Sequence, residues 1–416
     1  MRGAFIPVFV AGITPILVLA LIAGGLAFGW VEWQPSVMWT VQLGNVQEKS
    51  AVDAVTTYGP SVFATGHVGD YQAFYHGYPT YLFLDKYDQN GKVLWSKQFG
   101  SAGTNDYVGG VAVAANTIYL AVSLNDSSFL RNYDMSGNQI WTVKIPNLPS
   151  SESISIGTDH VYVTGTNGFS AYDLNGNLLW AKNATGTHIF ANSQAVYVGG
   201  DDHVQKYDTS GAPQWTYSSS LYGISGDATG IYVATLDFQP RVTPVFLYKL
   251  DSNGKVLWAS SIPAPDGQSV QQTPTVFADS SGIYVTVNQF VMKYDSNGNR
   301  AWFVQPAGRF SSFDAIAAAQ DGVYVGSCCA DAYLFKVGMS SSLILFGVNP
   351  PYSFIIVAIL GGVVASSIFW LRKHRRKRLH PGSADVMRYG RPKDSRTQKK
   401  FILVPKSNTI LKMSAQ

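Results

Sequence analysis

Six copies of one short motif restrict the folds that this 416-residue chain can adopt. Each copy places an Asp three residues before a Gly, and the Gly four residues before a Trp. The copies are YDQNGKVLW (87–95), YDMSGNQIW (133–141), YDLNGNLLW (172–180), YDTSGAPQW (207–215), LDSNGKVLW (250–258) and YDSNGNRAW (294–302). Asp-x-(Asn/Ser)-Gly suits a type I turn, in which the Asp side chain binds its own backbone and Gly takes the left-handed position. Because strand-like segments flank each copy, each one predicts a β-hairpin.

A calcium loop uses similar residues, but the spacing here is different. A loop of the EF-hand type has Gly at its sixth position and Glu at its twelfth. In this motif Gly is fourth and no Glu follows. We therefore interpret the motif as turn chemistry and predict no metal site.

The number of strands predicts the architecture. A strand such as HVYVTG (160–165) precedes each hairpin, and this signature occurs seven times. A seventh third strand, AYLFKVG (332–338), has no hairpin after it, whereas a seventh Trp stands near the start of the chain in VMWTVQL (37–43). The interval from one Trp to the next averages about 44 residues, which is typical of a four-stranded propeller blade. We predict an all-β, seven-bladed β-propeller over residues 37–338, closed by the N-terminal strand in the last blade.

The repeat Asp-x-x-Gly-x-x-x-Trp, preceded by a hydrophobic residue and Tyr, resembles the tryptophan-docking repeat of quinoprotein-like (PQQ-like) β-propellers. The resemblance implies that one Trp per blade wedges between neighbouring blades: Trp39, Trp95, Trp141, Trp180, Trp215, Trp258 and Trp302. It implies little about activity, because the family includes both quinone-dependent dehydrogenases and scaffold proteins without a cofactor. The dehydrogenases have eight blades, with acidic and amide groups around calcium and the quinone. Seven blades and only three glutamates favour a scaffold without a cofactor.

Two apolar stretches and an uneven charge distribution predict a membrane protein. Residues 3–31 carry no charge, and Tyr352–Leu371 is a second apolar run; both are long enough to span a bilayer. Residues 1–371 have 16 Lys+Arg against 24 Asp+Glu, a net charge of −8, whereas residues 372–416 have 14 against 2, a net charge of +12. Basic residues beside a span stay on the cytoplasmic side. The propeller is then extracytoplasmic, at the plasma membrane.

The predicted domains are an N-terminal transmembrane anchor with a short linker (1–36), the propeller (37–338), a linker with a C-terminal transmembrane helix (339–371) and a mostly disordered cytoplasmic tail (372–416). The first run could instead be a cleaved signal peptide, with small residues near Gly25. We expect Arg372–Arg378 to bind anionic lipid headgroups. The charge split suggests a membrane, not a nucleic acid, as the partner.

Candidate recognition residues lie on the face opposite the hairpins. The segment 67–81 concentrates rings that suit protein or sugar contacts, and 235–244 contains a single cation. The residues are Tyr71, Phe74, Tyr75, His76, Tyr78 and Arg241. The alternative is that these rings cover the flank of their own blade. Nearby, Cys328 and Cys329 are either a vicinal disulfide or an incidental pair, and Asn125 and Asn183 begin glycosylation sequons.

No Gly-x-Ser-x-Gly, His-Glu-x-x-His or phosphate-loop motif occurs in the chain. We therefore predict a non-enzymatic cell-surface recognition or scaffold protein, whose partner is a protein or glycan of the envelope. One alternative is a transmembrane sensor that signals through the basic tail. The other is a PQQ-dependent or other extracytoplasmic oxidoreductase.

Overall fold

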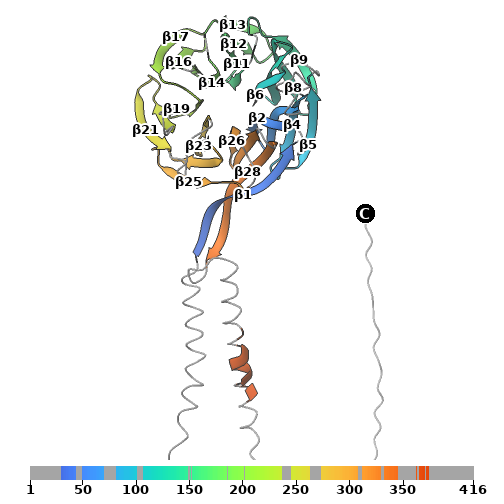
Figure 1. Cartoon of the computed structure of the whole chain (residues 1–416), viewed down its shortest axis with the longest axis vertical. Helices are drawn as coiled ribbons and strands as arrows, with labels where there is room; N and C mark the ends of the chain where they lie inside the picture. Colours follow the sequence, from blue (N-terminus) through green and yellow to red (C-terminus); the bar gives the residue numbers. More distant parts are fainter. Residues whose placement is uncertain are drawn as a thin grey trace, which may run out of the picture. The chain divides into compact units, whose positions relative to one another are not determined.

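The computed structural model describes residues 30–43, 49–69, 81–100, 106–148, 150, 152–184, 186–200, 202–236, 245–262, 273–307, 312–328, 332–344, 362, 365–370 and 372–373. The chain divides into two units, one of residues 30–344 and one of residues 1–29 with 345–416. The first unit contains seven antiparallel sheets of four strands each. Figure 1 shows these sheets arranged as a ring. The predicted seven-bladed β-propeller is confirmed.

Each of the first six blades is one continuous run of four strands, from the innermost to the outermost. Blade 1 is β2 (Lys49–Tyr58), β3 (Ser61–Gly69), β4 (Tyr81–Asp88) and β5 (Val93–Phe99). Blade 2 is β6 (Tyr107–Ala114), β7 (Thr117–Leu124), β8 (Ser127–Asp134) and β9 (Gln139–Lys144). Blade 3 is β10 (Ser153–Ile156), β11 (His160–Gly165), β12 (Gly168–Asp173) and β13 (Leu178–Lys182).

The next three blades follow the same plan. Blade 4 is β14 (His188–Ala191), β15 (Ala195–Gly199), β16 (His203–Asp208) and β17 (Pro213–Ser218). Blade 5 is β18 (Gly223–Asp227), β19 (Gly230–Leu236), β20 (Val245–Leu250) and β21 (Val256–Ile262). Blade 6 is β22 (Thr275–Asp279), β23 (Gly282–Val287), β24 (Phe290–Tyr294) and β25 (Arg300–Val304).

Blade 7 joins the two ends of the ring. Its inner strands are β26 (Ser312–Ala319), β27 (Gly322–Cys328) and β28 (Ala332–Ile344), and its outer strand is β1 (Trp30–Leu43). The predicted closure by the strand around Trp39 is therefore confirmed. The ladder also runs further than predicted: seven residue pairs, from Trp30↔Ile344 to Ser36↔Gly338, continue beyond Val37↔Val337. Residues 31–36 and 339–344, which we expected to be linkers, thus form a two-stranded ribbon that leaves the ring in Figure 1.

The hydrophobic core lies between the blades, because each second strand packs against a neighbouring blade on both of its faces. In β11 the side chains of Val161 and Val163 pack towards blade 2, and that of Tyr162 packs towards blade 4. This explains why the second strands are apolar at nearly every position instead of alternating. Buried aromatic rings recur at the equivalent position of all seven second strands: Phe63, Tyr119, Tyr162, Tyr197, Tyr232, Tyr284 and Tyr324.

In the part of the chain that the structure describes, no helix is long and apolar enough to cross a membrane. Most of both predicted spans lies outside the described residues: 3–29 of the first span, and 352–361, 363, 364 and 371 of the second. The tail from 374 onward also lies outside them. The two transmembrane helices, the basic tail and the extracytoplasmic placement stay predictions.

Candidate functional site

The repeated hairpin turns have the geometry that the motif predicts. In the turn between β4 and β5, the carboxylate of Asp88 accepts hydrogen bonds from the backbone N–H of Asn90 and of Lys92, each at 2.9 Å. Gly91 closes the turn with a positive φ of 81°. In five of the equivalent turns, hydrogen bonds from backbone and side-chain groups hold the pKa of the carboxylate below its usual range: Asp134, Asp173, Asp208, Asp251 and Asp295.

The same Gly also forms the contact between blades. A Cβ atom added to Gly91 would lie 2.8 Å from the indole of Trp39, so the ring packs directly on the glycine backbone. Five more Gly–Trp pairs repeat this contact: Gly137 with Trp95, Gly176 with Trp141, Gly211 with Trp180, Gly254 with Trp215 and Gly298 with Trp258. Each copy of the motif therefore contributes to two blade junctions: its Gly receives the Trp of the preceding copy, and its Trp covers the Gly of the next copy.

At most of these junctions the indole N–H also forms a hydrogen bond to the neighbouring blade. In five of them it donates to the carbonyl oxygen of the residue after the Asp, at 2.9–3.1 Å: Trp39 to Gln89, Trp95 to Met135, Trp180 to Thr209, Trp215 to Ser252 and Trp258 to Ser296. Between blades 2 and 3 the hydroxyl of Tyr119 donates to the corresponding carbonyl, that of Leu174, at 2.9 Å. Six of the seven Trp residues thus pack on a glycine of the next blade, and five of the six also donate a hydrogen bond to that blade.

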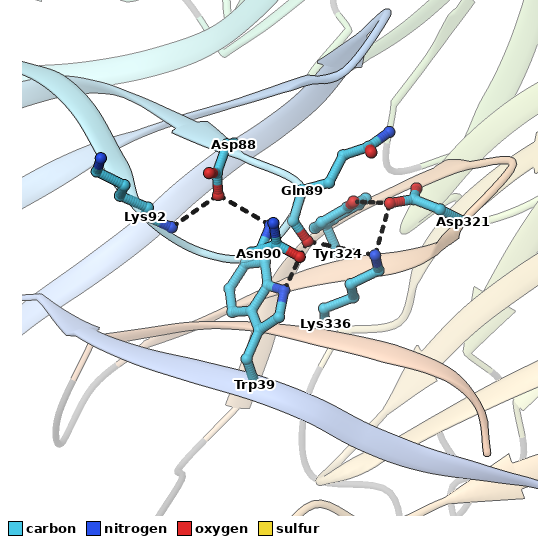
Figure 2. Close-up of polar contacts among 8 residues, drawn as sticks. All are labelled: Trp39, Asp88, Gln89, Asn90, Lys92, Asp321, Tyr324 and Lys336. Carbon is cyan, nitrogen blue, oxygen red and sulfur yellow. Dashed lines mark hydrogen bonds and ion pairs between the residues drawn. The ribbon is translucent and has the colours of Figure 1, made fainter. Parts of the chain in front are cut away.

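Figure 2 shows the junction where blade 7 meets blade 1. Trp39 of β1 and Lys336 of β28 both donate to the carbonyl oxygen of Gln89, at 2.9 and 3.3 Å. The ammonium of Lys336 also pairs with the carboxylate of Asp321 at 2.5 Å, and the hydroxyl of Tyr324 donates to the same oxygen at 2.9 Å. The two ends of the propeller are therefore joined to the same point of blade 1 by residues almost 300 positions apart in the sequence.

A channel of about 570 Å³ runs through the centre of the ring, lined by the innermost strands of all seven blades. Three acidic residues lie at equivalent positions of the inner strands: Glu152 directly precedes β10, Asp314 is the third residue of β26, and Asp53 is the matching residue of β2. This places them towards the end of the channel opposite the hairpins. This is the face on which we predicted ligand contacts. The channel mouth is our candidate functional site.

Asp53, His67 and Asp314 form a cluster of titratable groups at this mouth, across the seam between blades 1 and 7. Nδ1 of His67 lies 3.0 Å from Oδ2 of Asp53. Burial alone would lower the pKa of His67, but the charges of Asp53 and Asp314 more than offset it, and the pKa is raised. Burial, with a further contribution from the charge of Asp53, also raises the pKa of Asp314.

Backbone irregularities turn these two carboxylates towards the channel. Asp53 and Asp314 are the extra residues of β-bulges in β2 and β26, where the register shifts between Val52 and Ala54 and between Phe313 and Ala315. A bulge commonly re-aims a side chain at a strand end. Sequence reasoning missed this cluster, because neither the bulges nor the contact between the first and last blades has a local signal.

A second pocket of about 480 Å³ lies on the hairpin face between blades 5 and 6. Its lining includes Asp227, Asp279 and Asp295, but each carboxylate already accepts a hydrogen bond from a backbone N–H of its own turn. Asp227 also accepts one from the hydroxyl of Tyr232 in β19 at 2.9 Å. The carboxylates of this pocket therefore serve the turns, and the channel mouth stays our candidate site.

The predicted recognition residues Tyr71, Phe74, Tyr75, His76, Tyr78 and Arg241 lie outside the described residues, so their role stays a prediction. Cys328 ends β27 and is disulfide-bonded, whereas Cys329 also falls outside the described part. Asn125 is exposed in the turn between β7 and β8, and Asn183 is exposed after β13, both on the face opposite the hairpins. Nothing in the structure tests whether either carries a glycan.

The described residues provide no calcium site that could hold a quinone. Among the described residues, no three His, Cys, Asp or Glu side chains come close enough together to hold a metal ion. The carboxylates at the channel mouth face an imidazole that Asp53 already binds. We derive no chemistry through a quinone or a metal here.

The family model described as outer membrane protein assembly factor BamB matches residues 82–187 and 126–341, which together cover more than half of the chain. The chain therefore belongs to this family, and the predicted PQQ-like propeller repeat is confirmed. No curated protein matches the chain significantly.

Two solved structures are similar to the chain. The crystal structure of BamB from Moraxella catarrhalis has a TM-score of 0.48 and 16% identity, over 73% of this chain and 97% of that one. The structure of the Neurospora crassa Pan2 WD40 domain has a TM-score of 0.51 and 12% identity, over 72% of this chain and 96% of that one. At such identities the likeness of the second structure concerns the fold alone.

Proposed function

We propose that this protein is a non-enzymatic scaffold, tethered to the plasma membrane by both chain ends, whose extracytoplasmic propeller binds an envelope protein. One observation carries the proposal: the ends leave the ring together, as the paired strands β1 and β28. In the sequence, the apolar run 3–31 ends at the start of β1, and the run 352–371 begins eight residues after the end of β28. A tether of this kind holds the ring at one point and leaves its faces free for a partner.

Family membership supports the choice of a protein partner. The family is described as an outer membrane protein assembly factor, which is a role in protein assembly. We assign the binding face to the side opposite the hairpins, because the acidic channel mouth lies there and the predicted recognition segments connect strands that end there. A glycan of the envelope is the other ligand that the aromatic loop suits, and Arg372–Arg378 would bind anionic headgroups on the cytoplasmic side.

The tether is tested by extracting native membranes with alkaline carbonate. The full chain should stay in the membrane pellet, and a protease added from outside should degrade the propeller but protect the tail. Release of the intact chain into the supernatant would refute the tether.

The binding face is tested by photo-crosslinking in native membranes. A photoreactive amino acid is placed at Asn125, exposed on the face opposite the hairpins, or at Asn90, exposed on a hairpin. Asn125 should give a discrete adduct with one protein and Asn90 should not. Adducts from Asn90 alone would assign the binding face to the hairpins instead.

A further inference from the structure

The ribbon that leaves the ring has two chemically different faces. Residues directly opposite each other in an antiparallel pair share a face, and the pairs Trp33↔Ser341 and Pro35↔Met339 alternate with Gln34↔Ser340 and Ser36↔Gly338. Within these four pairs, one face presents Trp33, Pro35 and Met339 beside Ser341, and the other presents the polar side chains of Gln34, Ser36 and Ser340. Such alternation is the pattern of a sheet with one face in water and one against an apolar partner.

The apolar face has no partner among the described residues. The side chain of Trp33 is 61% exposed and that of Met339 is 43% exposed, whereas every propeller Trp of the docking repeat is at least half buried. On the polar face, by contrast, the hydroxyl of Ser340 donates to the carbonyl oxygen of Gln34 at 3.3 Å. Trp33 is the most exposed large apolar side chain among the described residues of 30–344, so it is the strongest candidate on the ribbon for contact with an apolar partner.

We propose that the apolar face of the ribbon binds the interfacial layer of a phospholipid bilayer, with Trp33 as its anchor; this rests on the tether proposed above. The uncharged run ends at residue 31, two residues before Trp33. At about 3.3 Å per residue, Trp33 lies about 7 Å beyond the end of that run. The headgroup layer is about 5–8 Å thick on each side of the hydrocarbon, and Trp concentrates there.

The size of the ribbon argues for lipid and against a second copy of the chain. Seven residue pairs are about 23 Å long, and two strands are about 10 Å wide, so the face covers about 230 Å². A stable protein interface buries about 800 Å² on each partner. Pro35 also removes a donor from the outer edge of β1, which disfavours the addition of another strand.

The test uses the full chain in vesicles of neutral and anionic phospholipid. An environment-sensitive fluorophore is attached through Ser341→Cys, on the face of Trp33, or through Gln34→Cys, on the polar face. The unsubstituted chain measures background labelling of the native cysteines. Lipids that carry a nitroxide near the headgroup should quench the label at position 341 severalfold more than the label at position 34.

Replacement of the anchor provides a second readout. Trp33→Ser, added to the Ser341→Cys chain, should reduce this quenching severalfold, and Trp33→Phe should restore part of it. Equal quenching at positions 341 and 34, in a chain that floats with the vesicles, would overturn the inference and leave the tether intact. Failure of the chain to float would instead refute the tether. Quenching at position 341 by a nitroxide on a second copy of the chain would replace lipid by a dimer contact.

Discussion

Blade 5 and blade 7 pair their third and outer strands in the same register, although only blade 5 connects these strands by a hairpin. In blade 5, a hairpin joins β20 and β21, Lys249 pairs with Trp258, and a bulge follows before Leu250 pairs with Val256. In blade 7 the equivalent strands are opposite ends of the propeller, yet Lys336 pairs with Trp39 and the same bulge follows before Val337 pairs with Val37. The register is therefore identical with and without the covalent turn.

The difference between the two blades shows how the turn contributes to setting the register of the outer strand. In blade 5 the Asp–Gly turn sets the register locally, because it brings the two strands together at small entropic cost. Blade 7 has no such turn, and its ladder continues for seven more residue pairs beyond the point where a hairpin would end it. The longer ladder replaces the turn, whereas the docking of Trp39 on blade 1 matches that of Trp258 on blade 6.

Removal of β1 should cause the largest loss of stability, because blade 7 then lacks its outer strand. A chain of residues 30–344 should unfold cooperatively, whereas one of residues 44–344 loses the ladder of β28 and the burial of Trp39. Loss of a large buried aromatic alone costs about 3–5 kcal/mol, against a total stability of about 5–15 kcal/mol for a domain. We expect the shorter chain to aggregate or to melt far lower in a thermal denaturation. Equal melting temperatures would show that the ring closes in another way.

Single Trp substitutions measure how much the Gly–Trp contact contributes to stability at a junction that has the hairpin and at one that lacks it. Trp39→Ala should destabilise the propeller by about 3–5 kcal/mol in chemical denaturation, because the ring packs on Gly91 and its N–H binds Gln89. Trp302→Ala is the matched variant: its neighbour is blade 7, where β28 and β1 take the place of the hairpin. We expect a smaller loss for it. A larger loss from Trp302 would contradict the importance that we give to the Gly–Trp contact.

The closing glycine gives the next largest effect. Gly91→Ala combines a left-handed backbone, which costs about 1–2 kcal/mol in an L residue, with a Cβ 2.8 Å from the indole of Trp39. Gly59→Ala has the same kind of backbone, at a φ of 55°, but a Cβ there meets nothing within 4 Å. The difference between the two unfolding free energies measures the interblade contact. Equal losses would mean that only the turn conformation matters.

The smallest expected effect is on the pH dependence of the unfolding free energy, in which the channel mouth and the hairpin face should differ. The pKa of His67 is raised, so its stabilising charge is fully present below the ordinary value of 6.5 and is lost as the pH rises through the raised pKa. We expect a decline of up to about 1 kcal/mol in unfolding free energy over that range, because the site is partly exposed. His67→Gln should flatten the decline.

Asp53→Asn should flatten it as well, because it removes the partner that holds the proton on His67. The hairpin carboxylates act in the opposite direction: their pKa values are lowered, so their contribution is lost only as the pH falls below the ordinary value of 3.8. A decline that persists unchanged in both variants would assign it to another group.

Much of the fold could be predicted from the sequence, because its determinants are local. The Asp-x-(Asn/Ser)-Gly turn is completed within five residues, as in Asp88 to Lys92, and its recurrence sets the number of blades. The unpaired strand at 332–338 and the extra Trp39 were enough to predict closure, since each end of the chain lacks what the other supplies. The docking role of the Trp residues followed from the resemblance to a known repeat.

The candidate site could not be predicted in the same way. Asp53 and Asp314 come together only because the first and last blades become neighbours, and each is turned by a bulge that no sequence pattern marks. The ribbon was taken for two linkers, because Trp30–Ser36 has strand character only when Gly338–Ile344 pairs with it. The sequence by itself determined the turns, the repeat and the number of blades, through interactions a few residues apart. The tertiary structure alone decided the channel mouth, the shared carbonyl at Gln89 and the ribbon, because each requires contacts between residues that lie some 250 to 310 positions apart.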